Sequence, residues 1–359
     1  MGAVCQCFQT QNSEETKKSL LTTTKASVSL DSKLSMNNFK VLKVIGKGSF
    51  GKVLLVSKKD NSTLYAMKIL KKKVVAATNQ KDHTKTEREI MESIKSPFIV
   101  QLKFAFQTET KLYMAMEYMK GGELFFHLRK CGRFTEERAT FYAAEILLAL
   151  EALHQRNFIY RDLKPENVLL DESGHIKITD FGLSKSGMKG SKKAFTFCGT
   201  PEYLAPEVLR NEGYGKQVDF WSFGALLYEM ISGAPPHYSK NRNEMYNNVL
   251  NKPIPMKPHF SSAACDLLSK LLQIDPSKRL SKMQEVKAHP FFGRINWSML
   301  QELNLEPPFK PRVSDPLDTR NFDTQFTNQP PEDSFDDKAS LNGKNEFRGW
   351  TYQESGAFN

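Results

Sequence analysis

Cysteine is scarce in this chain, and long hydrophobic runs are absent. The 359 residues include only five cysteines, and an odd number of mostly scattered cysteines favours free thiols over a disulfide framework. The longest nearly apolar stretch, Phe141 to Leu153, is interrupted by two glutamates and is too short to cross a bilayer. The N-terminus has no basic segment followed by an apolar core, as a secretory signal would. We therefore expect a cytoplasmic protein without a transmembrane helix.

A long run of Arg and Lys interleaved with aromatic residues is also missing. The chain holds 51 basic and 40 acidic residues, a formal net charge of +11, which alone would suit a polyanionic partner. Residues 1–38 carry +1 and residues 310–359 carry −3, which leaves +13 for residues 39–309. Because the densest basic cluster there is only Lys71 to Lys73, we expect a solvated basic surface and no nucleic-acid partner.

Composition and periodicity divide the chain into three parts. Residues 1–38 are rich in Ser, Thr, Gln and Lys, a composition that buries little and predicts a flexible leader. Residues 39–293 are regularly patterned. Residues 294–359 lose that pattern and gain Pro and Asp, but they keep spaced aromatic residues. This last part is expected to wrap on a surface as a tail.

The middle part predicts an α+β fold of two lobes. Apolar, β-branched stretches from Phe39 to about Leu70 are punctuated by glycine, which predicts antiparallel strands, and Asp60-Asn61 marks a turn between two of them. Residues 81–95 predict a helix. From Gly121-Gly122 onward the pattern is mainly helical, as in the spacing of apolar residues over Phe134–His154. A small antiparallel-sheet lobe with one helix should therefore precede a larger helical lobe.

The first predicted strands contain a glycine-rich segment, Gly46-Lys47-Gly48-Ser49-Phe50-Gly51-Lys52-Val53. Glycine lets backbone amides approach phosphate oxygens, and the flanking strands would hold the segment over them. A strand follows it, whereas a dinucleotide-binding fold needs a helix there. Lys68, on a β-rich segment, could pair with nucleotide phosphates, with a plain surface lysine as the alternative. Glu87 could fix this lysine, although Glu89 is a neighbouring candidate.

The strongest chemical pattern is Tyr160-Arg161-Asp162-Leu163-Lys164-Pro165-Glu166-Asn167, followed by Asp180-Phe181-Gly182. Phosphoryl transfer needs metal ligands, a cation on the moving phosphate and a carboxylate that orients the attacking hydroxyl. Asp180 and Asn167 offer oxygen ligands for Mg²⁺. Lys164 can neutralise the γ-phosphate, and Asp162 can accept the hydroxyl proton. Each residue alone would more often be a cap or turn residue, but the ordered set predicts catalysis.

These motifs resemble those of eukaryotic protein kinases over residues 39–293, and the resemblance extends to Ala205-Pro206-Glu207, Asp219 and Arg279. Tyr160, where many kinases have His, and residues 196–203 are similar to the AGC group, which includes protein kinase B and the ribosomal-protein and serum-regulated kinases. The resemblance implies a two-lobed kinase fold with a regulatory helix, and ATP and Mg²⁺ as cofactors. It implies catalytic roles for Asp162, Lys164, Lys68 and Glu87, and metal binding by Asn167 and Asp180.

The resemblance also implies a nucleotide site. Met119 would bind adenine through its backbone, with Met116 as gatekeeper and Glu117 beside it. The whole implied set is Gly46, Gly48, Ser49, Phe50, Gly51, Val53, Ala66, Lys68, Met116, Glu117, Met119, Glu123 and Phe326.

Residues 294–359 resemble the regulatory tail of AGC kinases. Residues 321–326 are similar to the segment that places an aromatic residue, here Phe326, near adenine. Residues 330–334 resemble the turn motif, with Ser334 as the phosphorylated residue, although Phe335 replaces the proline often found next. Residues 347–352 match the hydrophobic motif, in which Thr351 is the modifiable hydroxyl.

The activity implied by the resemblance is that of a monomeric protein serine/threonine kinase. Glu123, Glu166 and Glu229 match positions that receive arginines of the substrate, which implies protein substrates with basic motifs. An upstream activating kinase is expected to phosphorylate Thr196, and the phosphate should draw in Arg161, His83 and nearby basic groups. A pseudokinase or scaffold that binds partners through the tail is the alternative, and the intact catalytic set argues against it.

The N-terminus suggests lipid anchoring. Gly2 becomes terminal after removal of the initiator methionine, and Cys5 and Cys7 lie close enough to be palmitoylated. Two such lipid signals would give stable peripheral attachment to a membrane. Gln6 occupies the place usually taken by Ser or Thr, so acylation and an unmodified leader both remain open at this point.

Overall fold

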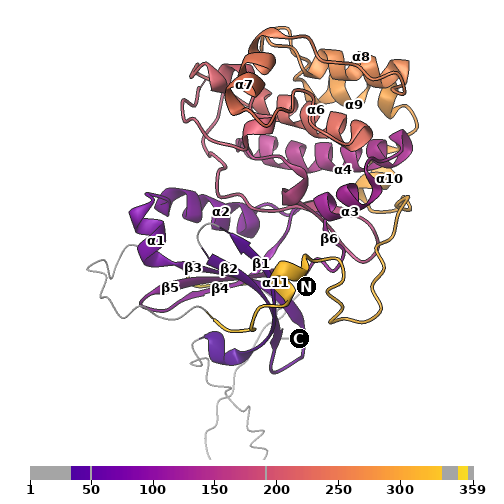
Figure 1. Ribbon diagram of the computed structural model, residues 1–359. Coiled ribbons are helices and arrows are strands. Elements are labelled where there is room, and N and C mark those ends of the chain that lie inside the picture. The colour runs from indigo at the N-terminus through magenta and orange to yellow at the C-terminus, as the bar shows by residue number, and fades with distance from the viewer. Residues whose placement is uncertain (1–33, 49–50, 191, 334–346, 355–359) are drawn as a thin grey trace, which may run out of the picture. The chain divides into compact units, whose positions relative to one another are not determined.

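A six-stranded antiparallel sheet forms the small lobe of the protein (Figure 1). The computed structural model describes residues 34–48, 51–190, 192–333 and 347–354. The strand order is β1-β2-β3-β5-β4-β9. The strands are β1 Phe39–Gly48, β2 Gly51–Lys58, β3 Leu64–Lys71, β4 Leu102–Gln107, β5 Lys111–Glu117 and β9 Tyr352–Gln353. The predicted antiparallel strands and the turn at Asp60-Asn61 are confirmed.

Two helices accompany this sheet, α1 (Lys72–Ala77) beside β3 and α2 (Lys81–Ser93) beside β4. The buried face of α2 carries Glu87, Ile90 and Met91, at the spacing of one helical turn. The helix predicted over residues 81–95 is confirmed. It ends slightly earlier because Ile94 adopts an extended backbone and its side chain is buried in the core.

The large lobe is mainly helical (Figure 1). Its helices are α3 Leu124–Cys131, α4 Glu136–Gln155, α5 Pro206–Leu209, α6 Gln217–Ser232, α7 Arg242–Asn251, α8 Ser262–Leu271, α9 Met283–Lys287 and α10 Trp297–Gln301. Short 3-10 helices of this lobe span Pro165–Asn167, Pro201–Tyr203 and Pro290–Phe292, and another, Met36–Asn38, directly precedes β1 in the small lobe. The helix predicted over Phe134–His154 is α4. It begins after Thr135 because the Thr135 hydroxyl oxygen accepts a hydrogen bond from the Arg138 amide.

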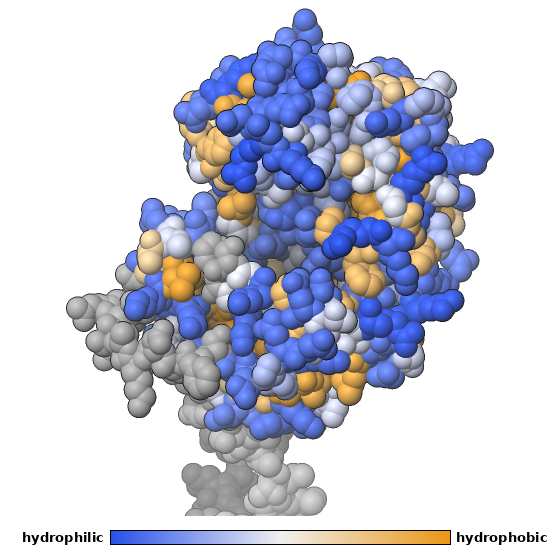
Figure 2. Space-filling model, in the orientation of Figure 1, coloured by the Kyte–Doolittle hydropathy of each residue, from blue (hydrophilic) through white to orange (hydrophobic). Residues whose placement is uncertain are grey.

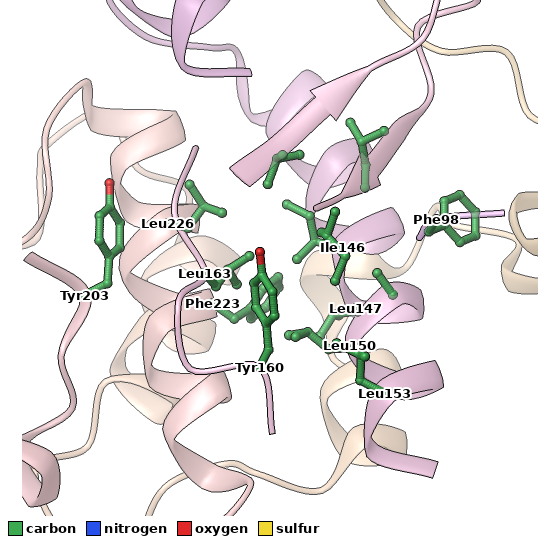
Figure 3. Packing of buried hydrophobic residues seen from close by; sticks show 14 of the residues in the cluster. Phe98, Ile146, Leu147, Leu150, Leu153, Tyr160, Leu163, Tyr203, Phe223 and Leu226 are labelled. Atoms are coloured by element: carbon green, nitrogen blue, oxygen red, sulfur yellow. The ribbon is translucent and has the colours of Figure 1, made fainter. Parts of the chain in front are cut away.

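The core of the large lobe lies between α4 and α6. Every residue of α6 from Val218 to Ile231 is buried. Ile146 and Leu150 of α4, Phe223 of α6 and Tyr160 belong to one buried cluster, and Figure 3 shows them close together. The chain segment that carries Tyr160 therefore packs against the two most buried helices of the protein.

A small second sheet lies where the lobes meet. It contains β6 (Gly122–Glu123), β7 (Val168–Leu170) and β8 (Ile176–Ile178). The Ile178 amide donates to the Phe98 carbonyl at 2.9 Å, and the Val100 amide donates to the Ile178 carbonyl at 3.1 Å. These bonds attach β8 to the segment that leads into β4. The residues that follow β8 are thus fixed next to the small lobe.

The tail returns to the small lobe. Helix α11 (Thr324–Thr327) packs against β1 (Figure 1), and β9 adds the last strand of the sheet beside β4. The expectation that the tail wraps on a surface is confirmed for its described residues. Among those same described residues, no helix has both the length and the apolar character needed to span a membrane. Hydrophilic residues predominate on the face shown in Figure 2, and hydrophobic ones form small separate areas.

Candidate active site

Lys68, Glu87 and Asp180 meet at the junction of the lobes. The Nζ atom of Lys68 on β3 lies 2.6 Å from Oε1 of Glu87 on α2 and 2.9 Å from Oδ1 of Asp180, just after β8. Glu87 is buried, whereas half of the Asp180 side chain is exposed. Glu89 is exposed on the same helix. The structure therefore pairs Lys68 with Glu87 and leaves the neighbouring candidate in solvent.

Lys68 and Asp180 stabilise each other's charge, whereas burial raises the pKa of Glu87 despite the nearby Lys68. Burial would lower the pKa of Lys68, but Asp180 and Glu87 outweigh burial and raise that pKa. The Lys68 ammonium lowers the pKa of Asp180 below its ordinary value. At neutral pH the site thus presents an ammonium group beside a half-exposed carboxylate. An anionic phosphate and a metal cation could each find a partner there.

Asp162 lies in a second polar cluster on the loop before β7. Its Oδ1 atom accepts a hydrogen bond from the Thr200 hydroxyl at 2.7 Å, and its Oδ2 atom lies 3.0 Å from Nζ of Lys164. The Lys164 ammonium also donates to the Thr200 hydroxyl at 3.0 Å. The Asn167 amide donates to the Asp162 backbone carbonyl and side chain at 2.8 and 3.0 Å. Asp162 is therefore fixed from several sides.

The backbone of this loop is held by Asp219 of α6. The Asp219 carboxylate is fully buried and accepts hydrogen bonds from the amides of Tyr160 and Arg161 at 2.9 and 2.8 Å. Arg161 has a φ of +71°, a left-handed conformation that costs free energy in a residue with a side chain. The two hydrogen bonds to Asp219 oppose that cost. Tyr160 adds a hydrogen bond from its hydroxyl to the Thr179 carbonyl at 2.5 Å, which links the loop to the residue before Asp180.

A divalent cation fits the residues between the two clusters. Because the Asn167 amide nitrogen is committed to Asp162, its carbonyl oxygen is left to serve as a ligand, as is the Asp180 carboxylate. The described part of the chain holds no group of three His, Cys, Asp or Glu side chains placed to bind a metal. Mg²⁺ commonly takes one or two protein ligands, phosphate oxygens and water. The two residues therefore suit a cation that a nucleotide helps to bind.

The glycine-rich segment forms the facing ends of β1 and β2. Gly48 pairs with Gly51, and Gly46 pairs with Val53. A Cβ atom at Gly51 would lie 1.6 Å from the Ile69 carbonyl oxygen, so β3 packs too closely for any other residue. A Cβ atom at Gly48 would meet no atom within 4 Å. Packing therefore explains Gly51, whereas no described neighbour would clash with a side chain at Gly48. Ser49 and Phe50 lie outside the described residues.

An apolar surface lines the hinge, which is the segment around Glu117 and Met119 that joins the two lobes. Val53 and Ala66 belong to one cluster with Tyr118 and Phe322, and the rings of Tyr118 and Phe322 stack at 5.7 Å. The sequence motifs predict a role for Phe326 and none for Phe322. The predicted Phe326 is half-buried on α11, which packs against β1.

Met116, Glu117 and Met119, which were predicted to lie at the adenine site, are close to this apolar surface. Met116 pairs with Ala66 in the sheet, and Met116 and Met119 are both buried. Glu117 extends its side chain to Lys177 at 2.7 Å.

Glu123, Glu166 and Glu229 converge from three elements. Burial, then the charge of Glu166, raises the pKa of Glu123 to about 7. Burial also raises the pKa of Glu229 to about 7, against the hydrogen bond that it accepts from the Tyr203 hydroxyl. Burial raises the pKa of Glu166 as well. One buried oxygen of Glu166 accepts no hydrogen bond within the described part of the chain. Such a group of carboxylates is suited to bind cationic side chains.

Thr196 is exposed on the segment that follows Asp180. Its carbonyl accepts a hydrogen bond from the Tyr214 hydroxyl at 2.7 Å, and Arg161 donates to the same hydroxyl at 3.1 Å. The pKa of His83 is lowered by burial and then by Arg161, with a smaller effect of Lys185. Tyr214 therefore links Arg161 to the backbone of Thr196, and Arg161 and Lys185 both lie close enough to His83 to lower its pKa.

The aromatic residues of the tail motif are buried against the small lobe. Phe347 and Trp350 are 4% and 2% exposed, and Thr351 between Trp350 and β9 is exposed. The Arg88 guanidinium of α2 lies 5.7 Å from the Trp350 ring, and the Lys72 ammonium lies 5.9 Å from the Phe347 ring. The basic cluster at the end of β3 thus touches the motif. Ser334, Gly2, Cys5 and Cys7 lie outside the described residues.

Comparison with known proteins agrees with this geometry. Residues 39–292 match the model of the protein kinase domain, and residues 313–352 match that of the protein kinase C terminal domain. Over 324 residues the chain is 50% identical to the serine/threonine-protein kinase gad8 of Schizosaccharomyces pombe, covering 89% of this chain and 57% of that protein. It is also 50% identical over 324 residues to the RAC family serine/threonine-protein kinase homolog of Dictyostelium discoideum, covering 89% and 73%.

Sgk1 of Homo sapiens is 51% identical over 302 residues, covering 83% of this chain and 70% of that serine/threonine-protein kinase. The chain spans roughly half to three quarters of the length of such relatives. The resemblance predicted from the sequence motifs is confirmed. This chain belongs to the protein kinase domain family, in the AGC group whose catalytic domain is followed by the protein kinase C terminal domain.

Proposed function

We propose that this protein transfers the γ-phosphate of ATP to serine or threonine hydroxyls of protein substrates. The observation that carries the proposal is the arrangement of Asp162 with Lys164 and Thr200, in which one carboxylate oxygen faces a hydroxyl group and the other faces an ammonium group. The names of the relatives, which are serine/threonine-protein kinases, support the choice of acceptor.

The chemical roles follow from the position of each group. Asp162 orients the acceptor hydroxyl and takes its proton while the hydroxyl oxygen bonds to the γ-phosphorus and ADP leaves. Lys164 neutralises charge on the transferred phosphoryl group, and Lys68, held by Glu87, pairs with the phosphates nearer the base. Asn167 and Asp180 would hold Mg²⁺, which would neutralise phosphate oxygens when bound.

Substrates with basic residues are proposed from the carboxylates of Glu123, Glu166 and Glu229. The oxygen of Glu166 without a described hydrogen-bond donor offers an acceptor for a guanidinium group. These three groups form an acidic site on a domain with an excess of basic residues. Selection of arginine-containing peptides from a peptide library tests the proposal, and a preference for acidic flanks would contradict it.

Activation by phosphorylation is proposed at Thr196 and Thr351. A phosphate on Thr196 adds about −1.5 to −2 charges close to Arg161, His83 and Lys185, which would order that segment. A phosphate on Thr351 would act beside the docked aromatic residues. Phosphorylation of Thr196 is proposed to be carried out by an upstream kinase. Ser334 is proposed as a third site from the turn motif alone.

The enzyme is proposed to be a cytoplasmic monomer. Its peripheral attachment to a membrane is proposed from Gly2, Cys5 and Cys7. Acylation at these residues would provide two lipid signals. Cell fractionation of wild type and Gly2→Ala tests attachment, and equal membrane association of the two would contradict it. The molar mass of the purified chain, measured by light scattering, tests whether it is a monomer.

The activity itself is tested by incorporation of phosphate from Mg·ATP into an arginine-containing serine peptide. Asp162→Asn should lose activity by several orders of magnitude, while the matched carboxylate substitution Glu137→Gln, at an exposed position on α4, should retain it. Transfer at the wild-type rate by Asp162→Asn would contradict the catalytic role. Absence of transfer by wild type phosphorylated at Thr196 would favour the pseudokinase or scaffold alternative.

A further inference from the structure

Charged side chains of alternating sign connect the end of the tail to the large lobe. Glu354, directly after β9, lies 3.2 Å from Lys95 and 2.7 Å from Lys103 on β4. Lys103 lies 3.5 Å from Oε1 of Glu117, at the end of β5. The other oxygen of Glu117 lies 2.7 Å from Lys177 on β8. Three ion pairs thus lead from the tail through the sheet to the second lobe.

This series of ion pairs passes beside the expected nucleotide site. Glu117 directly follows Met116, which pairs with Ala66 across the sheet. Lys177 lies on the strand that leads to Asp180. The Glu117–Lys177 pair therefore connects the hinge end of the small lobe with the strand before the metal ligand. A change in this pair would alter how the hinge and Asp180 face a bound nucleotide.

Backbone pairing places Glu354 beside Lys103. Gln353 of β9 pairs with Phe104 of β4, and the Glu354 amide donates to the Lys103 carbonyl at 3.0 Å. The carboxylate of Glu354 therefore reaches Lys103 only when β9 is paired with β4. Docking of the tail and completion of the ion-pair series are the same event.

Lys103 is shared between two carboxylates. The side chains of Lys103, Glu117 and Glu354 are only 24–25% exposed, so their pairs are screened less than those of fully exposed groups. Burial would lower the pKa of Lys103, but Glu354 and then Glu117 outweigh it and raise that pKa. The contact with Glu354 is the shorter one. Without Glu354, Lys103 would pair with Glu117 alone. Lys103 and Lys177 would then compete for the Glu117 carboxylate.

We propose that Glu354 and Lys103 are positioning residues that couple docking of the tail to nucleotide binding at the hinge. With the tail docked, Glu354 satisfies Lys103 and leaves Glu117 turned toward Lys177. With the tail undocked, Lys103 pulls the Glu117 side chain toward β4 and loosens the connection between the lobes. This route is separate from the Lys68–Glu87 pair, because it runs through β4 and β5 and not through α2. The proposal rests on the proposed kinase function for its kinetic readout.

The test compares Glu354→Gln with Lys95→Gln in the full chain. Glu354→Gln keeps the shape of the side chain and removes its charge. We expect the KM for ATP to rise about two- to five-fold with kcat nearly unchanged, as the loss of one partly exposed ion pair implies. Lys95→Gln removes the other partner of Glu354, which does not lead to the hinge, and should keep the wild-type KM. Hydrogen exchange at the β9 amides should show in both variants that the tail stays docked.

A double-mutant cycle identifies the route. Lys103→Met should remove most of the effect of Glu354→Gln, since both substitutions break the same pair, whereas Lys103→Arg should largely keep the wild-type KM. A wild-type KM for Glu354→Gln would overturn the proposal, as would an equal rise for Lys95→Gln, which would indicate only a loosened tail. Titration with an ATP analogue measures affinity without phosphate transfer. A chain that binds nucleotide but transfers no phosphate would refute the kinase function while still testing this coupling.

Discussion

The Thr200 hydroxyl donates a hydrogen bond to Asp162 at 2.7 Å and accepts one from Lys164 at 3.0 Å. Thr200 stands 38 residues after Asp162, on the segment that also carries Thr196. An ordered segment therefore brings a hydroxyl group to the carboxylate that we propose as the proton acceptor. Thr200 thus acts as a positioning residue for both charged groups.

Replacement of Thr200 by valine tests this relationship. Thr200→Val keeps the shape of the side chain and removes both hydrogen bonds, so we expect kcat to fall about 10- to 100-fold, from the loss of about 1.5–3 kcal/mol in charge-assisted bonds. Thr200→Ser should keep most of the activity because it keeps the hydroxyl. Steady-state kinetics with a saturating peptide would check both. A valine variant with wild-type kcat would show that Asp162 needs no support from Thr200.

The acidic site predicts a pH dependence of peptide binding. Because the pKa values of Glu123 and Glu229 are raised to about 7, these groups take up protons as the pH falls below 7 and lose the charge that binds arginine. The KM for an arginine-containing peptide should therefore rise between pH 8 and pH 6. A peptide with neutral residues at those positions should show a much smaller rise. Equal pH profiles for the two peptides would contradict this prediction.

The Glu207–Arg279 pair predicts a large effect on stability. Its two contacts are 2.6 and 2.8 Å long, and both side chains are almost completely buried. Because Glu207→Gln leaves a buried guanidinium without its charge partner, the free energy of unfolding should fall by about 3–5 kcal/mol. The exposed pair of Lys270 and Asp266 offers a control, and Lys270→Gln should leave the denaturation midpoint nearly unchanged because solvent screens an exposed ion pair. Chemical denaturation of the two variants checks the difference. Similar midpoints would contradict it.

The parts of the candidate site that could be predicted from the sequence are those whose residues lie close together in the chain or at a fixed spacing. Asp162, Lys164 and Asn167 lie within one short segment, and the spacing of Lys68 and Glu87 from the glycine-rich segment places them on one strand and one helix. Such patterns depend on neighbouring residues, so they are visible without coordinates. For the same reason the expected strands and the helices α2 and α4 agreed with the structure to within a few residues.

Contacts between distant segments could not be predicted in this way. The stacking of Phe322 on Tyr118 and the approach of Glu354 to Lys103 each join tail residues to the small lobe. Neither periodicity nor composition encodes which distant surfaces meet, because that depends on the packing of the whole fold. Asp333 is a further example, since its carboxylate accepts a hydrogen bond from Tyr113 and lies 3.1 Å from Lys111.

Docking of the tail motif should stabilise α2 and, through it, the Lys68–Glu87 pair. Trp350 is almost fully buried, its indole donates to the Tyr113 carbonyl at 3.4 Å, and its ring lies 5.7 Å from the guanidinium of Arg88, the neighbour of Glu87. Trp350→Ala removes a large buried aromatic side chain, which typically costs about 3–5 kcal/mol. This loss of free energy should mainly weaken docking of the tail and not the fold as a whole, because only the tail and its docking surface lose contacts.

The expected result for Trp350→Ala is a fall in kcat/KM of at least about ten-fold, with faster hydrogen exchange in α2 and β4, since α2 would lose its contact with the tail. Arg348→Ala is the matched control, because Arg348 lies on the same segment and is exposed. It should leave exchange and activity unchanged. If Trp350→Ala released the tail but kept wild-type kcat/KM, α2 would hold Glu87 in place without the tail, and phosphorylation of Thr351 could not act through α2.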